Sequence, residues 1–417
     1  MSTTKVAELA LSGRGVTEAK AIRDFIWMSP GVTGAFLVTT SAGDVVVNTG
    51  LAREAEEHRS RFAAKSDAPV RVIVFTQSHA DHTGGAELFR GPETRVLAQA
   101  NYHDVTDYWQ RLAGFYTVRS RKLWGGVLGN TNAPIVPPPR PELTEDFEDR
   151  LAFELGGRRF ELLSTPGGET TDSLVVWLPD EKIVFTGNLF GPAFENFPAL
   201  YTIRGDKYRS AREYLRSLDR VAALGAELMI TGHGDPIEGA EAIADGLSRM
   251  RAAVEYVYEE TTRGMNEGRD VHTLMREVTL PAELGIGQVH GKVSWAVRAI
   301  WEEHAGWFHY DTTASLYDVP PSAVWEELRE LSGGTERLVA AARTHASAGE
   351  LSEALHLLDI AEAGEGPTGS RDALALRSEV LEALIERAGG ENFSEMRWLR
   401  TQLDAVRAQM DAQPKTD

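Results

Sequence analysis

The chain has 417 residues, which exceeds one typical globular domain and favours a large domain plus at least one smaller unit. Its composition, 42% hydrophobic and 25% charged, indicates a folded protein with a substantial core. The formal net charge of -19 disfavours a nucleic-acid partner, since no local basic patch stands out in the sequence. Because there is no cysteine, disulfides, thiolate ligands and a cysteine nucleophile are excluded, and His, Asp and Glu remain as metal ligands.

Targeting and membrane signals are not apparent. The first residues, MSTTKVAELALSGRG, lack the apolar core of a secretion signal, and no later segment is a long uncharged apolar run. We therefore expect a cytoplasmic protein with no membrane span.

The first part of the chain predicts alternating strands and helices. Residues 34–49 have the pattern of two strands joined by a Ser-Ala-Gly-Asp turn. Residues 52–65 have helical spacing, and residues 70–77 form a β-branched run that is typical of a buried strand. Residues 79–85 thus lie in a loop after a buried strand, a place where function concentrates in layered α/β folds. Residues 108–140 have no firm period and are interpreted as an insertion that walls a pocket.

The second part of the chain predicts more strands and then helices. Two strand pairs surround Gly156-Gly157 and Pro179-Asp180, a helix covers residues 207–224, and AELMITGHGDP is a strand followed by a loop. From residue 237 onward helices predominate. Two Ala- and Leu-rich segments after residue 340 resemble a helical hairpin of the tetratricopeptide type. We expect a catalytic domain over residues 1–275 and a helical domain over residues 276–417.

The segment TQSHADHTGG, residues 76–85, carries the strongest chemical signal. His79, Asp81 and His82 can converge on one metal ion if the backbone turns sharply, and Gly84-Gly85 supports such a turn. The alternative is an ordinary polar surface loop. Its position behind a buried strand and before a helix favours the metal site.

Two later loops supply further candidate ligands. Glu169 follows Pro-Gly-Gly in STPGGETTDS, and His233 lies between two glycines in MITGHGDP. A solvated loop acid and a hydrogen-bonded loop histidine are the ordinary alternatives. His290, His304 and His309 are interpreted as structural, because they lack companion acids at ligand spacing.

These loops together resemble the metallo-β-lactamase superfamily over about residues 20–250. More narrowly, the PGGE loop, LYTIRGDKYR at residues 200–209 and AGWFHYD followed by Pro-Pro resemble the alkylsulfatase branch. The resemblance implies an α/β fold, a metallo-β-lactamase-type αββα sandwich, followed by an all-helical dimerisation domain. It also implies a zinc-dependent hydrolase of a sulfate ester or a similar anionic, partly apolar small molecule.

Carried over residue by residue, the resemblance implies one zinc ion held by Asp81, His82 and His233 and a second held by His79, Glu169 and the residue at position 77. The sequence departs from the family at two ligand positions. Position 77 is Gln77 instead of histidine, and Asn188 stands where a bridging acid is usual. A neutral amide is a poorer zinc ligand than imidazole or carboxylate.

Two interpretations of the metal count follow. In the first, the Asp81, His82 and His233 site is filled, the other is weak or empty, and the enzyme works with one metal ion. In the second, both sites bind, and Asn188 or Glu195 completes the bridge. We favour the first.

Catalytic roles can be assigned on this resemblance. Zinc lowers the pKa of a bound water from about 15.7 toward roughly 7, and Asp81 would orient or deprotonate that water. Arg204 is expected to hold the anionic group, assisted by Tyr201, because its planar fork matches sulfate oxygens. The alternative is a surface arginine paired with Asp206. Aromatic residues that could line a tunnel, or simply belong to the core, are Phe115, Tyr116, Trp124, Phe190 and Phe194.

Two other functions remain open. One is a metallo-hydrolase of a different ester or lactone, and the other is a noncatalytic dimeric binding protein on a degenerate fold. In either case we expect a homodimer by resemblance. Aromatic residues of the C-terminal helices are interpreted as core or dimer-interface anchors: Trp295, Trp301, Trp307 and Phe308.

Overall fold

The computed structural model describes residues 5–129, 137, 140–207, 209–364 and 369–413. The chain divides into two compact units, the first over Thr3–Arg121 and Gly125–His304 and the second over Lys122–Trp124 and Ala305–Asp417. The expected domain boundary after residue 275 lies inside the first unit, because helices on both sides of it pack on that unit's core.

Two β-sheets form the centre of the first unit. The seven-stranded sheet contains β1 (Lys20–Arg23), β2 (Ile26–Ser29), β3 (Ala35–Thr40), β4 (Gly43–Val47), β5 (Val70–Val74), β6 (Arg95–Gln99) and β7 (Glu145–Phe147), in that order. The six-stranded sheet has the order β13 (Ile237–Glu238), β12 (Leu228–Thr231), β11 (Ile183–Gly187), β10 (Leu174–Leu178), β9 (Arg158–Ser164) and β8 (Arg150–Leu155). Pairing is antiparallel from β1 to β4 and parallel from β4 to β7, and in the second sheet only β11 and β12 pair in parallel.

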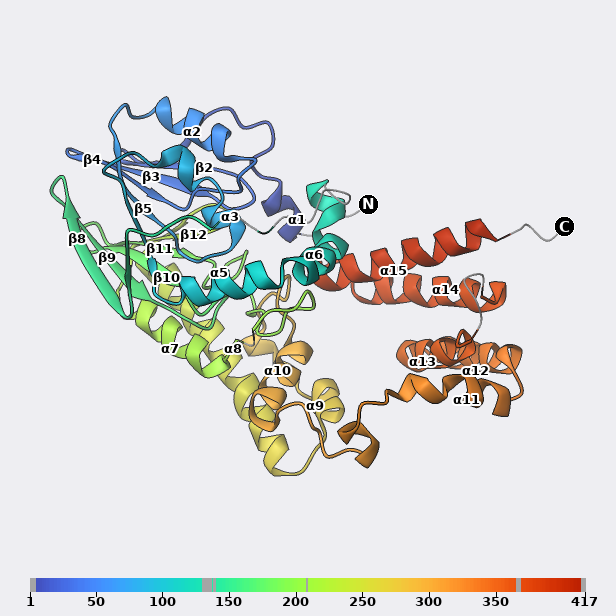
Figure 1. Cartoon of the computed structure of the whole chain (residues 1–417). Coiled ribbons are helices and arrows are strands. Elements are labelled where there is room, and N and C mark those ends of the chain that lie inside the picture. The colour runs from blue at the N-terminus through green and yellow to red at the C-terminus, as the bar shows by residue number, and fades with distance from the viewer. Residues whose placement is uncertain (1–4, 130–136, 138–139, 208, 365–368, 414–417) are drawn as a thin grey trace. The chain divides into compact units, whose positions relative to one another are not determined.

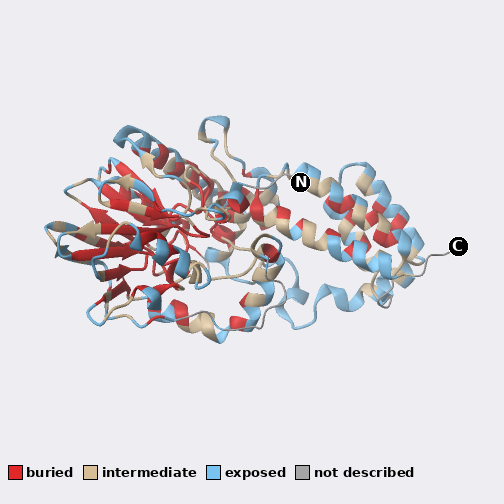
Figure 2. Ribbon diagram, turned by 90° about the horizontal axis from the view of Figure 1, so that it is seen from above, coloured by how far each residue is buried: buried red, intermediate tan, exposed pale blue. Residues whose placement is uncertain are grey.

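Both faces of the central strands are buried, which explains their continuous apolar sequence. In β10, Leu174, Val176 and Leu178 point into the core between the sheets, whereas Val175 and Trp177 point toward the helices on the outer face. Successive strand side chains alternate between faces, so a strand that is covered on both sides needs no polar alternation. The predicted αββα sandwich is thereby confirmed, and Figure 2 shows the buried residues concentrated in the strands.

Helices cover the outer faces of both sheets (Figure 1). The helices before the second sheet are α1 (Lys5–Ala10), α2 (Ala55–Ala63), α3 (Ala80–Thr83), α4 (Ala86–Phe89), α5 (Tyr102–Arg111) and α6 (Ala113–Leu128). Later helices are α7 (Ala211–Ala222), α8 (Ala240–Asn266), α9 (Val271–Glu277), the 3₁₀ turn η1 (Ala282–Leu284) and α10 (Val293–Ala305). Phe62 and Phe89 join α2 and α4 to the first sheet, and α7 to α10 bury their apolar residues against the second.

Most predicted elements of the first unit are confirmed, with shorter bounds. The predicted hairpin over 34–49 is β3 and β4, and the predicted strand over 70–77 ends at Val74, which leaves Thr76 and Gln77 in the loop. Residues 108–128 differ from the expected irregular insertion, since they belong to α5 and α6. Residues 130–136, 138 and 139 of that insertion lie outside the described residues.

The second unit is helical, as expected for the C-terminal region. It contains η2 (Thr313–Leu316), η3 (Pro321–Val324), α11 (Trp325–Leu331), α12 (Thr335–Ser347), α13 (Leu351–Ala361), α14 (Arg371–Arg387) and α15 (Phe393–Ala412). Small and apolar residues of α12, α13 and α14 form one core cluster, and α14 and α15 form another.

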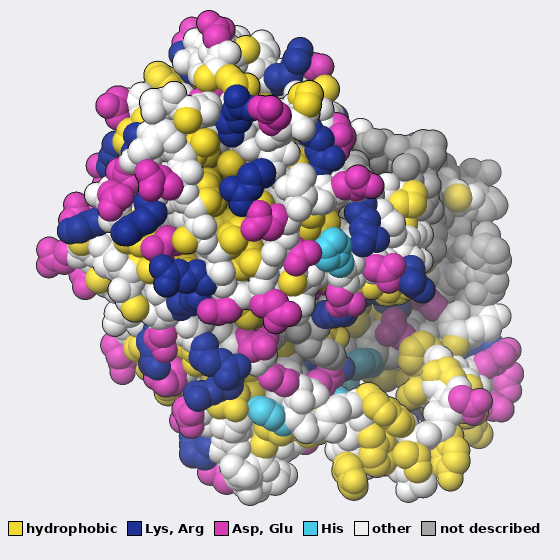
Figure 3. Space-filling view, turned by 60° about the vertical axis from the view of Figure 1, so that its left-hand side comes forward, with side chains coloured by type: hydrophobic (Ala, Val, Ile, Leu, Met, Phe, Trp, Pro, Cys, Tyr) yellow, Lys and Arg dark blue, Asp and Glu magenta, His cyan; other side chains and the backbone are white. Residues whose placement is uncertain are grey.

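Charged side chains of both signs are mixed on the surface. On the face in Figure 3, Lys and Arg lie among Asp and Glu, without one continuous basic patch. Within the described part of the chain, no helix is both long enough and apolar enough to cross a membrane.

Candidate metal centre

The loops that carry the candidate ligands are joined by backbone hydrogen bonds. Gly232 N donates to Gly187 O at 2.8 Å, and Gly34 N donates to Gly232 O at 2.8 Å. A Cβ atom at position 232 would lie only 2.1 Å from Asn188 Oδ1, so glycine is needed for the loops after β11 and β12 to approach. The strand ends therefore bring His233 into the same region as the loop after β5.

The Gly84-Gly85 pair has a different role from the predicted one. Their φ angles of -62° and -94° are accessible to any residue, so no special turn requires glycine. Space is the reason: a Cβ at Gly84 would lie 2.5 Å from Ala52 N, and one at Gly85 would lie 2.3 Å from Thr49 O. These glycines let the loop that carries the ligands pack against the segment after β4.

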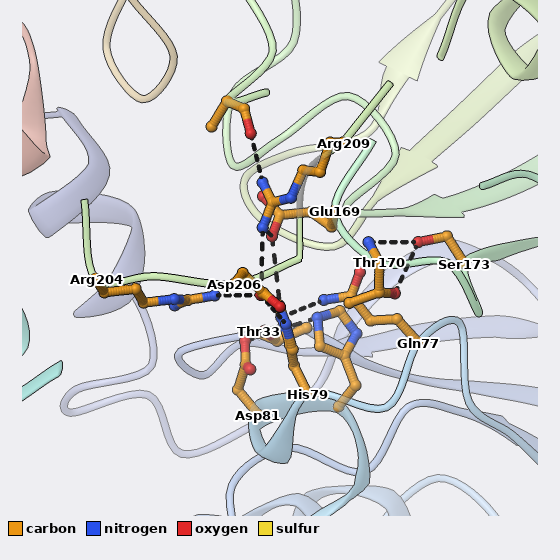
Figure 4. A network of polar contacts seen from close by, with 12 residues as sticks. Thr33, Gln77, His79, Asp81, Glu169, Thr170, Ser173, Arg204, Asp206 and Arg209 are labelled. Carbon is orange, nitrogen blue, oxygen red and sulfur yellow. Dashed lines mark hydrogen bonds and ion pairs between the residues drawn. The ribbon is translucent and has the colours of Figure 1, made fainter. Parts of the chain in front are cut away.

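Asp81 lies on the one-turn helix α3, where its Oδ2 accepts a hydrogen bond from Thr33 Oγ1 (Figure 4). Burial alone would raise the pKa of its carboxyl group. His82, His79 and His233, together with the Thr33 hydrogen bond, outweigh burial and lower the pKa to about 2. Asp81 is therefore an ionised acceptor at neutral pH.

The proton position on His82 follows from its neighbours. Asn48 Oδ1 accepts hydrogen bonds from Thr76 N at 3.0 Å and from Thr76 Oγ1 at 3.1 Å. Since the only hydroxyl proton of Thr76 is used there, Thr76 Oγ1 accepts the contact of 3.1 Å from His82 Nδ1, which must carry the proton. Burial lowers the pKa of His82 to about 4. The neutral imidazole thus presents an unprotonated Nε2, the form that binds metals.

Burial also lowers the pKa of His233, although Asp81 and a hydrogen bond with the Val32 backbone raise it. A neutral His233 completes a set of two imidazoles and one carboxylate, which are ordinary zinc ligands. His82 Nε2 lies 3.6 Å from Asp81 Oδ2 and, among the described residues, has no hydrogen-bond partner. The donor chemistry fits a divalent ion. The spacing is looser than ligation requires, since no three described His, Asp or Glu side chains gather tightly enough to hold one.

Gln77, His79 and Glu169 have other polar partners, close to Asp81 (Figure 4). Gln77 Nε2 donates to His79 Nδ1 at 2.9 Å, and His79 Nε2 lies 3.7 Å from Asp206 Oδ2. Glu169 Oε2 accepts from Arg209 Nη2 at 3.1 Å, and Glu169 Oε1 lies 3.5 Å from His290 Nε2. Burial would raise the pKa of Glu169, but Arg209, His290 and His79 hold it well below its ordinary value.

Arg204 pairs with Asp206, as the alternative interpretation has it, but the pair is not on the surface. Their side chains are 19% and 4% exposed, and Arg204 Nη2 lies 3.9 Å from Asp206 Oδ2. The Arg204 guanidinium also lies 5.7 Å from the centre of the Trp109 ring. Tyr108 donates to Asp206 Oδ1 at 2.8 Å. Arg204 is therefore held by partners from α5 as well as by its own loop.

The predicted tunnel residues differ in their burial and in their neighbours. Phe115 is 51% exposed, while Phe190 is completely buried in the core against the second sheet. Phe194 and Tyr201 are partly buried against the same core. Trp124 belongs to the second unit, where its ring lies 4.3 Å from that of Phe393.

One of the predicted aromatic residues, Tyr116, lies near His79, because its ring contacts the Trp109 ring, which in turn contacts the His79 ring. The two rings are 4.2 Å apart, and the Trp109 ring is 5.7 Å from that of His79. The aromatic contact to the site thus comes from α5 and α6.

The two proposed bridging residues, Asn188 and Glu195, contact different parts of the first unit. Asn188 is buried beside Gly232, with no hydrogen-bond partner for its Oδ1 among the described residues. Glu195 instead forms an ion pair of 2.5 Å with Arg249 on α8. Among the residues that the structure describes, no hydrogen bond or ion pair joins Glu195 to a candidate ligand.

Three charged or titratable side chains of the site were not predicted as such. Asp206 and Arg209 lie in the LYTIRGDKYR segment, where only Arg204 and Tyr201 were selected. His290, interpreted as structural, contacts Glu169. Its neighbour Gly291 allows the backbone to approach closely, because a Cβ there would lie 2.2 Å from Pro198 O, but this contact is visible only in the structure.

Comparison with known proteins gives the same two-part organisation. The metallo-beta-lactamase superfamily model matches residues 28–233, and the alkyl sulfatase dimerisation model matches residues 271–402. The chain thus contains a metallo-β-lactamase domain. Its superfamily domain is followed by a domain of the alkyl sulfatase dimerisation type, so the resemblance to the alkylsulfatase branch is confirmed.

Relatives of this chain include a linear primary-alkylsulfatase of a Pseudomonas species, 29% identical over 73% of the chain and 62% of the relative. An alkyl/aryl-sulfatase of Saccharomyces cerevisiae is 23% identical over 73% of the chain and 51% of that protein. The chain thus spans between about half and two thirds of these relatives' lengths. A solved sec-alkylsulfatase from Pseudomonas has the same fold, with a TM-score of 0.78, 20% identity, and coverage of 96% of this chain and 67% of that one.

Proposed function

We propose that this chain is a zinc-dependent hydrolase of sulfate esters with a partly apolar alcohol, and that one zinc ion is held by Asp81, His82 and His233. The observation that carries the proposal is the His82 imidazole. Its Nδ1–H donates a hydrogen bond to Thr76 Oγ1. The lone pair of the buried Nε2 atom therefore remains available, 3.6 Å from the ionised carboxylate of Asp81. The alkylsulfatase relatives support the choice of substrate class.

When bound, the ion would supply a Lewis acid and lower the pKa of water. Asp81 would orient the attacking water or accept its proton, since it is ionised and fixed by Thr33. Arg204 would bind the sulfate group, because a guanidinium matches oxyanions in a planar, bidentate manner. Trp109 and Tyr116 would contact the apolar part of the substrate.

The test combines metal analysis with sulfate release from a medium-chain alkyl sulfate. We expect bound zinc and turnover in the unmodified chain, and loss of turnover in Asp81→Ala. Asp235→Ala is the matched control, because that aspartate is 76% exposed and pairs only with Lys20 among the described residues. Full turnover and full metal content in Asp81→Ala would refute the role of Asp81.

Other outcomes of this test select the alternative functions. Metal without sulfate release would indicate a different ester or lactone, which the departures at Gln77 and Asn188 make a specific second candidate. The absence of metal, with no uptake of added zinc, would indicate a noncatalytic binding protein.

We further propose a cytoplasmic homodimer in which the C-terminal helices, residues 276–417, provide the interface. The match to the alkyl sulfatase dimerisation model supports this assembly. Trp301 is buried in the core of the first unit and anchors the fold, whereas Trp307 is 72% exposed and Tyr310 is 89% exposed. Light scattering at micromolar concentration tests the assembly. We expect a dimer, weakened in Trp307→Ser, and a monomeric unmodified chain would reject it.

A further inference from the structure

Glu169 has an arginine beside one of its carboxylate oxygens and a histidine beside the other. Its Oε2 is 3.1 Å from Arg209 Nη2, and its Oε1 is 3.5 Å from His290 Nε2. The Arg209 side chain is only 3% exposed, and its Nη1 donates to Ala199 O at 2.8 Å. The guanidinium group is therefore fixed in place rather than free to swing away.

Asp206 adds a second carboxylate to the same cluster and brings a second guanidinium with it. Its Oδ2 lies 3.8 Å from Arg209 and 3.9 Å from Arg204. Two buried carboxylates thus face two guanidinium groups, and their charges balance within the protein (Figure 4). A divalent ion added here would meet two permanent positive charges at short range in a buried site.

His79 offers no free lone pair to such an ion. Its Nδ1 accepts the Gln77 amide at 2.9 Å, and its Nε2 therefore carries the proton and faces Asp206. The neighbouring half of the centre is different. Among the described residues no lysine or arginine forms an ion pair with Asp81, whose Oδ2 lies 3.6 Å from His82 Nε2.

We propose that the Arg209 guanidinium takes the place of a second metal ion. Glu169, Asp206 and His79 are then held by charges of the protein itself. One divalent ion binds in the other half of the centre, at Asp81, His82 and His233. This inference rests on the proposed function, since it presumes a metal-dependent enzyme. It assigns to Arg209 a positioning role that the sequence pattern did not single out.

The test measures zinc stoichiometry, independently of activity. The purified full chain is loaded with zinc, dialysed, and analysed by plasma mass spectrometry and by calorimetric zinc titration. We expect one ion per chain in the unmodified protein. Arg209→Met removes the charge at similar length and is expected to bind two ions, because Glu169 then has no guanidinium partner and Asp206 keeps only Arg204. Arg204→Met is the matched control and is expected to keep one, since Arg204 does not contact Glu169.

Two further variants keep the proposal testable if Arg209→Met folds poorly. Glu169→Gln is expected to retain one ion, because Glu169 is not a ligand in this arrangement. Arg209→Lys, which keeps the charge, is also expected to retain one. Two tight ions in the unmodified chain, a single ion in a folded Arg209→Met, or loss of the ion in Glu169→Gln would each overturn the inference.

The outcome is separable from that of the proposed function. Two ions together with sulfate release would overturn this inference alone. One ion without sulfate release would leave the role of Arg209 supported and reject the sulfatase. The absence of any bound zinc would overturn both.

Discussion

The two halves of the centre use the same kinds of side chain but differ in how their charge is balanced. Around Asp81, no lysine or arginine of the described residues forms an ion pair with the carboxylate, which lies beside His82. Around Glu169 and Asp206, arginines neutralise the carboxylates. The comparison teaches that the presence of His, Asp and Glu does not by itself define a metal site. The partners that already occupy these groups decide where a cation can bind.

The comparison is tested most severely by removing a ligand from the Asp81 half. We expect His82→Ala to lose bound zinc and to lower kcat/KM by more than about 100-fold, beyond the roughly 10- to 100-fold cost of outer partners. His103→Ala is the control, because that histidine is 51% exposed and contacts Asp146. Metal analysis and sulfate release measure the effect. An active, zinc-loaded His82→Ala would show that the cation binds elsewhere.

A smaller effect is expected from the partner that fixes the His82 proton. Thr76→Val removes the acceptor for Nδ1–H, so zinc affinity should fall roughly 10- to 100-fold. Competition titration with a zinc chelator measures it. Thr262→Val is the control, since that hydroxyl bonds only within α8. Equal zinc affinity in Thr76→Val and the unmodified chain would argue against the assigned tautomer.

Substitution of Arg204 distinguishes two roles of this side chain, binding the sulfate group of the substrate and balancing the charge of Asp206. If it binds sulfate, Arg204→Ala should raise KM for an alkyl sulfate by about 10-fold, the scale of one charge-assisted hydrogen bond, with a smaller change in kcat. Arg204→Lys should recover only part of the loss, because lysine lacks the planar fork. An unchanged KM with a lower unfolding temperature would mean that Arg204 serves only to balance Asp206.

The smallest expected effect is a change in unfolding free energy with pH that arises from His58. This change limits the pH range in which the variants can be compared. His58 is buried, and burial followed by the nearby Arg61 charge lowers its pKa from 6.5 to about 4. The unfolded chain therefore takes up a proton first as pH falls, so stability is present at pH 7 and is lost toward pH 4. We expect about 1 kcal/mol less unfolding free energy at pH 5.5 than at pH 7 from His58 alone. Urea unfolding of the unmodified chain and His58→Gln measures it, and an equal pH slope in both would contradict the assignment.

Much of the fold was predictable because it follows from local patterns. The continuous apolar run in β10 and the β3–β4 hairpin have clear periodicity and turn residues. The motif around His79, Asp81 and His82 was predictable for the same reason, since three ligand types occur within four residues after a buried strand. Five short strands, β1, β2, β6, β7 and β13, were not predicted, because two to five residues carry little periodicity.

The charge balance of the site was not predictable, because it depends on distant segments. Arg209 meets Glu169 across 40 positions in sequence, and His290 reaches the same carboxylate from the loop before α10. No spacing rule connects these segments. The position of the proton on His82 likewise depends on Asn48 at the end of β4, a residue that carries no signature of a metal site.

Asn48 has a further consequence for how the centre is loaded. It adopts φ of 58°, which is uncommon outside glycine, and its side-chain oxygen fixes the Thr76 hydroxyl. The imidazole it controls is consequently ready before any ion arrives. Binding at Nε2 would release no proton from His82, so zinc uptake through this ligand should depend little on buffer ionisation near neutrality.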